Sequence, residues 1–220
     1  MPNGITGRFG VEIELNSFDA RDFVKNPLKK DEKPLGIDRV ASIVSGLGLA
    51  CDVHEWRYNH NSEVWSCKPD NSCGIELCSP VMFDTHQVMM VMDALEEDDC
   101  LTSDNRCAFH VHIELESMDL DEVAASIPAW WIKCEHVFMD FADPSRKNNR
   151  YCKPIGLTDM VSHDEAVVPD VLFKKLATKY LSVNSFHFFN RRRPTIEFRI
   201  AEGTKNSEIA CNWIEILMAF

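Results

Sequence analysis

Basic residues are scarce in this chain of 220 residues. It contains 23 lysines and arginines against 35 aspartates and glutamates, so its formal net charge is −12. A protein that binds nucleic acid or an anionic membrane through charge needs a positive surface field. We therefore predict no nucleic-acid partner and no membrane partner. The surplus of carboxylates suits divalent cations, although solubility explains most of it equally well.

Long apolar runs and paired cysteines are missing as well. No apolar run has the length of a transmembrane helix, and residues 1–8 contain no apolar segment of a secretory signal. The nine cysteines include no CxxC pair, which is the spacing typical of a structural zinc site. We expect these cysteines to be reduced thiols of a cytoplasmic protein.

Hydrophobic residues make up 45% of the chain, which is enough for one domain over residues 1–220. Helical patterns of apolar residues cover 37–47, 86–95, 120–141, 171–180 and 209–220. We expect Pro128 to divide the pattern at 120–141 into two parts. The pattern at 209–220 has no stop signal, so we expect the chain to end inside that helix. The mixture of helices with short strands favours an α+β domain with a largely antiparallel sheet.

The most informative strand pattern is Phe109–Leu115, which alternates apolar and polar residues. In a strand, His110, His112 and Glu114 share one face, while the apolar residues share the other. Such a face can bind a metal, move a proton or lie in water. The pattern alone leaves these alternatives open.

Three further strand patterns also place ionisable residues opposite an apolar face. They carry Glu12 and Glu14, Glu76, and Glu197 with Arg199. Taken singly, each is more simply explained as a solvated face, because antiparallel sheets often expose one side to water. Exposed strand faces usually also contain Thr, Ser, Lys and Gln, however, whereas these hold almost only Glu and His.

Carboxylates that converge in one sheet repel one another unless cations lie among them. An oxygen-rich site with one histidine suits Mg²⁺ or Mn²⁺, whereas the two histidines alone could serve a zinc or iron enzyme. Glu12, Glu14 and Glu76 favour magnesium. In the long polar segment 143–170, Arg146 and Arg150 are candidates to contact phosphate. We expect Trp130 and Trp131 to belong to the core.

Six segments in this order resemble the amidoligase family, which is related to glutamine synthetase and to glutamate–cysteine ligase. They are Phe9–Leu15, Trp65–Pro80, Cys107–His112, Asn149–Cys152, Lys179–Asn184 and Thr195–Thr204. The resemblance extends from about residue 8 to about residue 215. One departure is Ala108, where the family commonly has glycine; a methyl group is acceptable there if the backbone is ordinary β.

This resemblance implies a glutamine synthetase-like catalytic fold, with a curved, largely antiparallel sheet flanked by helices. It also implies ATP and Mg²⁺ (or Mn²⁺) as cofactors and an acyl-phosphate route from a carboxylate and an amine to an amide. The substrates would be small molecules or peptides, and the relation to glutamine synthetase makes a homo-oligomer a hypothesis.

The resemblance also implies residue roles. The implied metal ligands are Glu12, Glu14, Glu76, His110 and Glu197. The implied catalytic residues are Arg199, His110 and Glu197, and the implied nucleotide contacts are Arg150, Lys179, Arg199 and Asp70. Weaker matches place His112, Tyr151 and Asn184 beside substrate or nucleotide, while Glu114 lies outside the match.

Two other functions stay open at this point. The pair His110 and His112 could serve a metal-dependent hydrolase, and the chain could be a binding module that retains the fold without catalysis. No residue identifies the acid or the amine.

Overall fold

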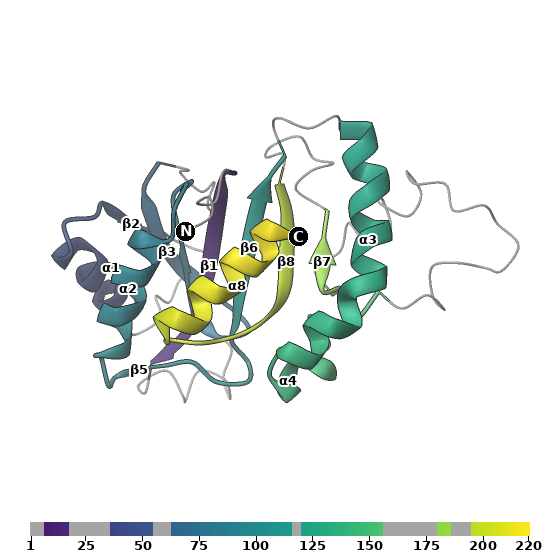
Figure 1. Cartoon of the computed structure of the whole chain (residues 1–220). Helices are drawn as coiled ribbons and strands as arrows, with labels where there is room; N and C mark the ends of the chain where they lie inside the picture. The colour runs from purple at the N-terminus through teal and green to yellow at the C-terminus, as the bar shows by residue number, and fades with distance from the viewer. Residues whose placement is uncertain (1–6, 18–35, 55–62, 116–119, 156–179, 186–194) are drawn as a thin grey trace, which may run out of the picture. The chain divides into compact units, whose positions relative to one another are not determined.

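A computed structural model describes residues 7–17, 36–54, 63–115, 120–155, 180–185 and 195–220. These residues fall into two compact units (Figure 1). Unit 1 comprises Met1–Val111 and Gly203–Phe220, and unit 2 comprises His112–Glu202. Among the described residues, no helix combines the length and apolar character needed to cross a lipid bilayer.

The strands of unit 1 follow the order β2-β3-β4-β1-β6, and β5 pairs with β1. Their bounds are β1 (Phe9–Ser17), β2 (Cys51–Val53), β3 (Trp65–Asp70), β4 (Gly74–Cys78), β5 (Leu101–Thr102) and β6 (Ala108–Glu114). The pairs β1/β4, β1/β5 and β3/β4 are antiparallel, and β2/β3 is parallel. The expected strand at 109–115 is therefore confirmed, with Ala108 as its first, extended residue.

The described residues of unit 1 also form three helices. They are α1 (Ile37–Gly46), α2 (His86–Glu96) and α8 (Ser207–Ala219), and α2 packs beside α8 (Figure 1). The apolar face of β1 is buried, and so are the apolar stripes of all three helices. Burial of this apolar surface is the main stabilising contribution to the unit. It leaves the opposite face of β1 to Glu12 and Glu14.

A tight turn joins β3 to β4. Asp70 ends β3, and its Oδ1 accepts hydrogen bonds from the backbone N–H groups of Ser72 (2.6 Å) and Cys73 (3.2 Å). Gly74 follows with φ of 108°, a left-handed conformation that favours glycine. Strand β3 continues to Asp70, and residues 71–73 form the turn.

The described part of unit 2 contains the last three residues of β6 together with two helices and two further strands. These are α3 (Leu120–Phe141), α4 (Pro144–Lys147), β7 (Val183–Asn184) and β8 (Thr195–Glu202), and β7 pairs antiparallel with β8. Trp131 of α3 stacks on Phe138 and packs against Phe198 of β8, with ring centroids 4.8 and 5.0 Å apart. The observed fold is thus α+β with mostly antiparallel pairing and flanking helices.

Several expectations for α3 and its surroundings are wrong. Helix α3 passes through Pro128 without a break, because a proline costs one backbone hydrogen bond, which packing on either side can offset. Trp131 is buried as expected, but Trp130 is exposed, since neighbouring helical residues point about 100° apart. Arg146 is buried and donates to the carbonyl oxygens of Arg199 (2.5 Å) and Ile200 (3.3 Å), so it supports β8 rather than a phosphate.

Some predicted features lie outside the described residues. They are nearly all of the helix predicted at 171–180 and part of the long polar segment at 143–170. Strand β5 had no recognisable signal, because two residues are too few to show alternation.

Gly203 should tolerate no side chain. A Cβ built there would lie 2.5 Å from Cys107 Cβ and 2.8 Å from the Cys107 carbonyl carbon. Overpacking of this kind costs about 1–3 kcal/mol, so Gly203→Ala should lower the free energy of unfolding by that amount. Urea denaturation measures it.

Gly46→Ala is the matched control. A Cβ at Gly46 meets nothing within 4 Å, and alanine is the better helix former, so we expect unchanged or slightly greater stability. A Gly203→Ala protein that unfolds at the wild-type urea concentration would show that this close approach is wrong.

Candidate functional site

Strand register brings acidic side chains of unit 1 onto one face. In the β1/β4 pair, Glu14 lies opposite Glu76 and Glu12 lies opposite Cys78. In the β3/β4 pair, Lys68 lies opposite Glu76. Directly opposed residues of antiparallel strands point to the same side with Cβ atoms about 5 Å apart. Residues far apart in the sequence therefore become neighbours through strand pairing alone.

These side chains are not a solvated face. Glu14 is 6% exposed, Glu76 is 7% exposed and His110 is 2% exposed, whereas ordinary surface carboxylates lie largely in water. Burying several carboxylates is costly unless positive charges or hydrogen bonds compensate. The simpler explanation of a water-facing strand is therefore wrong for these residues, and the compensating groups define the site.

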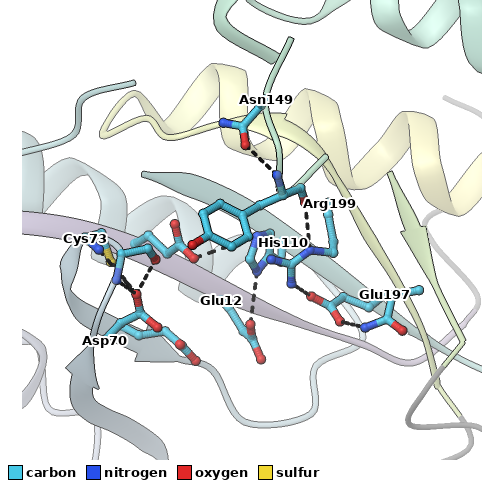
Figure 2. A network of polar contacts seen from close by, with 12 residues as sticks. Glu12, Asp70, Cys73, His110, Asn149, Glu197 and Arg199 are labelled. Atoms are coloured by element: carbon cyan, nitrogen blue, oxygen red, sulfur yellow. Dashed lines mark hydrogen bonds and ion pairs between the residues drawn. The ribbon is translucent and has the colours of Figure 1, made fainter. Parts of the chain in front are cut away.

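His110 lies between the two glutamates of β1. Its Nδ1 is 3.1 Å from Glu12 Oε2, and its Nε2 is 3.9 Å from Glu14 Oε1 (Figure 2). Strand β6 is the neighbour of β1 in the order of unit 1, which explains how the imidazole reaches both carboxylates. Of the predicted site residues, Glu12, Glu14, Glu76 and His110 are thus brought together in unit 1.

Lys68 supplies positive charge to this group, and sequence reasoning assigned it no role. Its Nζ is 2.6 Å from Glu76 Oε1, and Cys78 Sγ donates to the same oxygen at 3.1 Å. Burial and then the Glu12 charge raise the pKa of Glu76 to about 7, against the lowering influence of Lys68. Burial works to lower the pKa of Lys68, but Glu76 and Glu12 outweigh it and raise the pKa well above its ordinary value.

Among the described residues of unit 1, two sets of ligand atoms lie close enough to hold a cation. Glu12, Glu76 and Cys78 form one set, and Glu14, Asp70 and Cys73 form the other; the ligand atoms in each set lie within 4.8 Å of one another. Burial raises the pKa of both thiols well above the ordinary value. Protonated thiols are poor ligands for soft metals, so the carboxylate oxygens make these sets fit Mg²⁺ or Mn²⁺ better than zinc.

Asp70 performs a structural task that its predicted role did not include. Burial works to raise its pKa, but hydrogen bonds from Ser72 and Cys73 outweigh this and lower it. The carboxylate thereby orders the β3–β4 turn beside Cys73 (Figure 2). Its predicted contact with the nucleotide stays a prediction.

Unit 2 contains the predicted site residues Glu197 and Arg199. Arg199 forms an ion pair through Nη1 with Oε1 of the buried Glu197, and Asn184 Nδ2 donates to Glu197 Oε2 at 2.7 Å (Figure 2). The register of β7 and β8 places Asn184 directly opposite Glu197. Arg199 Nε also donates to the carbonyl oxygen of Tyr151 at 3.4 Å. Asn184 and Tyr151, both weaker matches, therefore contact the predicted pair.

The remaining predicted contacts differ in their surroundings. Arg150 is exposed; its guanidinium lies over the Tyr151 ring at 4.6 Å and donates to the Tyr151 hydroxyl at 2.7 Å. His112 and Glu114 are partly buried in β6. Lys179 lies outside the described residues.

Comparison with known proteins supports the resemblance. A family model described as "Putative amidoligase enzyme" matches residues 6–220. No curated protein matches the chain at a significant level.

Replacing Glu76 should alter how stability depends on pH. The folded pKa of about 7 lies above the ordinary value of 4.5. Between these values the folded state holds a proton that the unfolded state has released, so the contribution of Glu76 to stability falls as pH rises. With EDTA present, the free energy of unfolding of the wild-type protein should fall by up to about 3 kcal/mol more than that of Glu76→Gln when the pH rises from about 5 to about 8.

Chemical denaturation at a series of pH values measures this difference. If both proteins show the same pH dependence, the raised pKa of Glu76 is wrong.

Proposed function

The chain belongs to the amidoligase family, and on that premise we propose that it is an ATP- and Mg²⁺-dependent carboxylate–amine ligase. Family membership supports ligase activity in general. The observation that carries the finer proposal is the cluster of the buried Glu14 and Glu76 with the partly buried Glu12, in which His110 contacts Glu12 and Glu14. Such a group needs cations, and its oxygen ligands suit the magnesium that accompanies ATP.

Amide formation from a carboxylate and an amine needs activation of the carboxylate. In the proposed reaction, a carboxylate oxygen of the acid attacks the γ-phosphorus of ATP, and ADP leaves. The amine nitrogen then attacks the acyl carbon of the acyl phosphate, loses a proton, and inorganic phosphate leaves. Bound divalent cations would neutralise the phosphate oxygens during the first step.

The residues of unit 1 would hold those cations. Glu12, Glu14 and Glu76 supply oxygen ligands, and their strand register fixes the spacing. His110 contacts both glutamates of β1, so it either adds a ligand or orients the carboxylates. A glutamine synthetase-like arrangement of the sheet is part of this proposal.

In unit 2, Arg199 would stabilise negative charge on the transferred phosphoryl group. Its pairing with buried Glu197, which Asn184 also contacts, restricts the guanidinium to one position before substrate arrives. Glu197 is proposed as a further metal ligand. Arg150, Lys179 and Asp70 are proposed as nucleotide contacts. The substrates are proposed to be a carboxylate and an amine on small molecules or peptides, in the cytoplasm.

The direct test incubates the protein with ATP, Mg²⁺ and a pool of amino acids and small amines, and follows ADP release. We expect substrate-dependent ADP formation. Glu14→Gln removes a proposed ligand charge with little change in shape, and Arg199→Ala removes the proposed phosphate contact. Each should reduce turnover by about 10²–10³-fold, as expected for loss of one preorganised charge in an active site.

Arg39→Ala is the control. Arg39 forms an exposed ion pair with Asp98 at 2.5 Å, so its loss should leave ADP release unchanged. Absence of nucleotide binding with Mg²⁺ or Mn²⁺ present, or tightly held zinc without ATP binding, would contradict the ligase proposal and favour a metal-dependent hydrolase.

A further inference from the structure

The ammonium group of Lys68 lies beside the clustered carboxylate side chains of unit 1. It lies on β3, opposite Glu76 of β4, and its Nζ is 2.6 Å from Glu76 Oε1. The Lys68 side chain is 30% exposed and that of Glu76 is 10% exposed. At this distance and degree of burial, the pair interacts more strongly than an ordinary surface salt bridge.

This ammonium group reduces the repulsion between neighbouring carboxylates. Glu12 and Glu76 each contribute an oxygen to one compact set of ligand atoms, completed by Cys78. The buried carboxylate of Glu76 and the partly buried carboxylate of Glu12 repel each other at this separation, and a positive charge reduces that cost. The ammonium of Lys68 compensates part of this negative charge and holds Glu76 against β3.

A divalent cation at the same set of ligand atoms needs the same oxygens. Glu76 Oε1 accepts from both Lys68 and Cys78 in the structure. A cation bound through that oxygen must displace the ammonium or share the carboxylate with it, because both positive charges beside one oxygen repel each other. Lys68 therefore already occupies the oxygen of Glu76 that the cation would need.

We propose that Lys68 is a positioning residue that competes with the divalent cation for Glu76 and thereby weakens cation binding to a reversible range. This inference rests on the proposed function, because it assumes that Glu12 and Glu76 bind the cation. A merely structural role makes the opposite prediction. If Lys68 only kept Glu76 in place, its removal would loosen the site and weaken cation binding.

Measuring Mn²⁺ binding to the full chain distinguishes the competing role of Lys68 from a merely structural role. The amount of free Mn²⁺, measured by electron paramagnetic resonance at about pH 8, gives the dissociation constant without any enzymatic turnover. We expect Lys68→Met to bind Mn²⁺ about tenfold more tightly than wild type, the size expected for losing one competing charge-assisted hydrogen bond that is partly exposed. Without metal, the variant should melt at a lower temperature, and Mn²⁺ should raise its melting temperature more than that of wild type.

Three further variants complete the test. Lys68→Gln removes the charge but keeps a hydrogen-bond donor, so it should show the same tightening even if Lys68→Met folds poorly. Lys68→Arg keeps the charge and should bind Mn²⁺ as wild type does. Lys147→Met removes an exposed lysine paired with Asp140 at 3.0 Å in unit 2, and should leave Mn²⁺ affinity unchanged.

If both Lys68→Met and Lys68→Gln bind Mn²⁺ as tightly as wild type or more weakly, the proposal that Lys68 competes with the cation is wrong. The proposed metal site itself would not be contradicted by that result. Absence of Mn²⁺ binding by wild type is a different result, because it would overturn the metal site and the proposed function together.

Discussion

Repulsion among buried carboxylates is the constraint on which the functional part of this protein depends. Glu14 and Glu76 are almost fully buried, and Glu12 contacts the same histidine as Glu14. A sheet that only had to be stable would place apolar or neutral side chains at these positions. The protein instead compensates part of the charge with the Lys68 ammonium, and His110 contacts Glu12 and Glu14. In the proposed ligase, this partial compensation would leave the carboxylates able to bind a cation.

The fold provides this group through strand register rather than through flexible loops. The apolar face of β1 packs into the core of unit 1, so Glu12 and Glu14 must point to the other side. The antiparallel pairing of β1 with β4 then places Glu76 opposite Glu14, and the pairing of β4 with β3 places Lys68 opposite Glu76. Side chains on paired strands are held more rigidly than side chains on loops, which suits the proposed transfer of a phosphoryl group.

The sequence predicted the strands better than it predicted their partners. Alternation identified β1 and β6 because each buries one face, and it grouped Glu12 with Glu14 correctly. It could not show that Lys68 pairs with Glu76 or that Asn184 contacts Glu197, because register is set by three-dimensional pairing. Arg146 was misjudged since an arginine that binds backbone carbonyls and one that binds phosphate look alike in sequence. Helix α3 also continues through Pro128, where helix propensity alone predicts a break.

The most direct test of the central claim is the position of Mn²⁺ in crystals grown with a non-hydrolysable ATP analogue, located by anomalous scattering. We predict anomalous peaks at the carboxylates of Glu12, Glu14 and Glu76, with the phosphates of the analogue as further ligands. Crystals in which the analogue or Mn²⁺ binds only elsewhere, with Lys68 still paired to Glu76, would contradict the claim that this acidic group is a cation site for ATP.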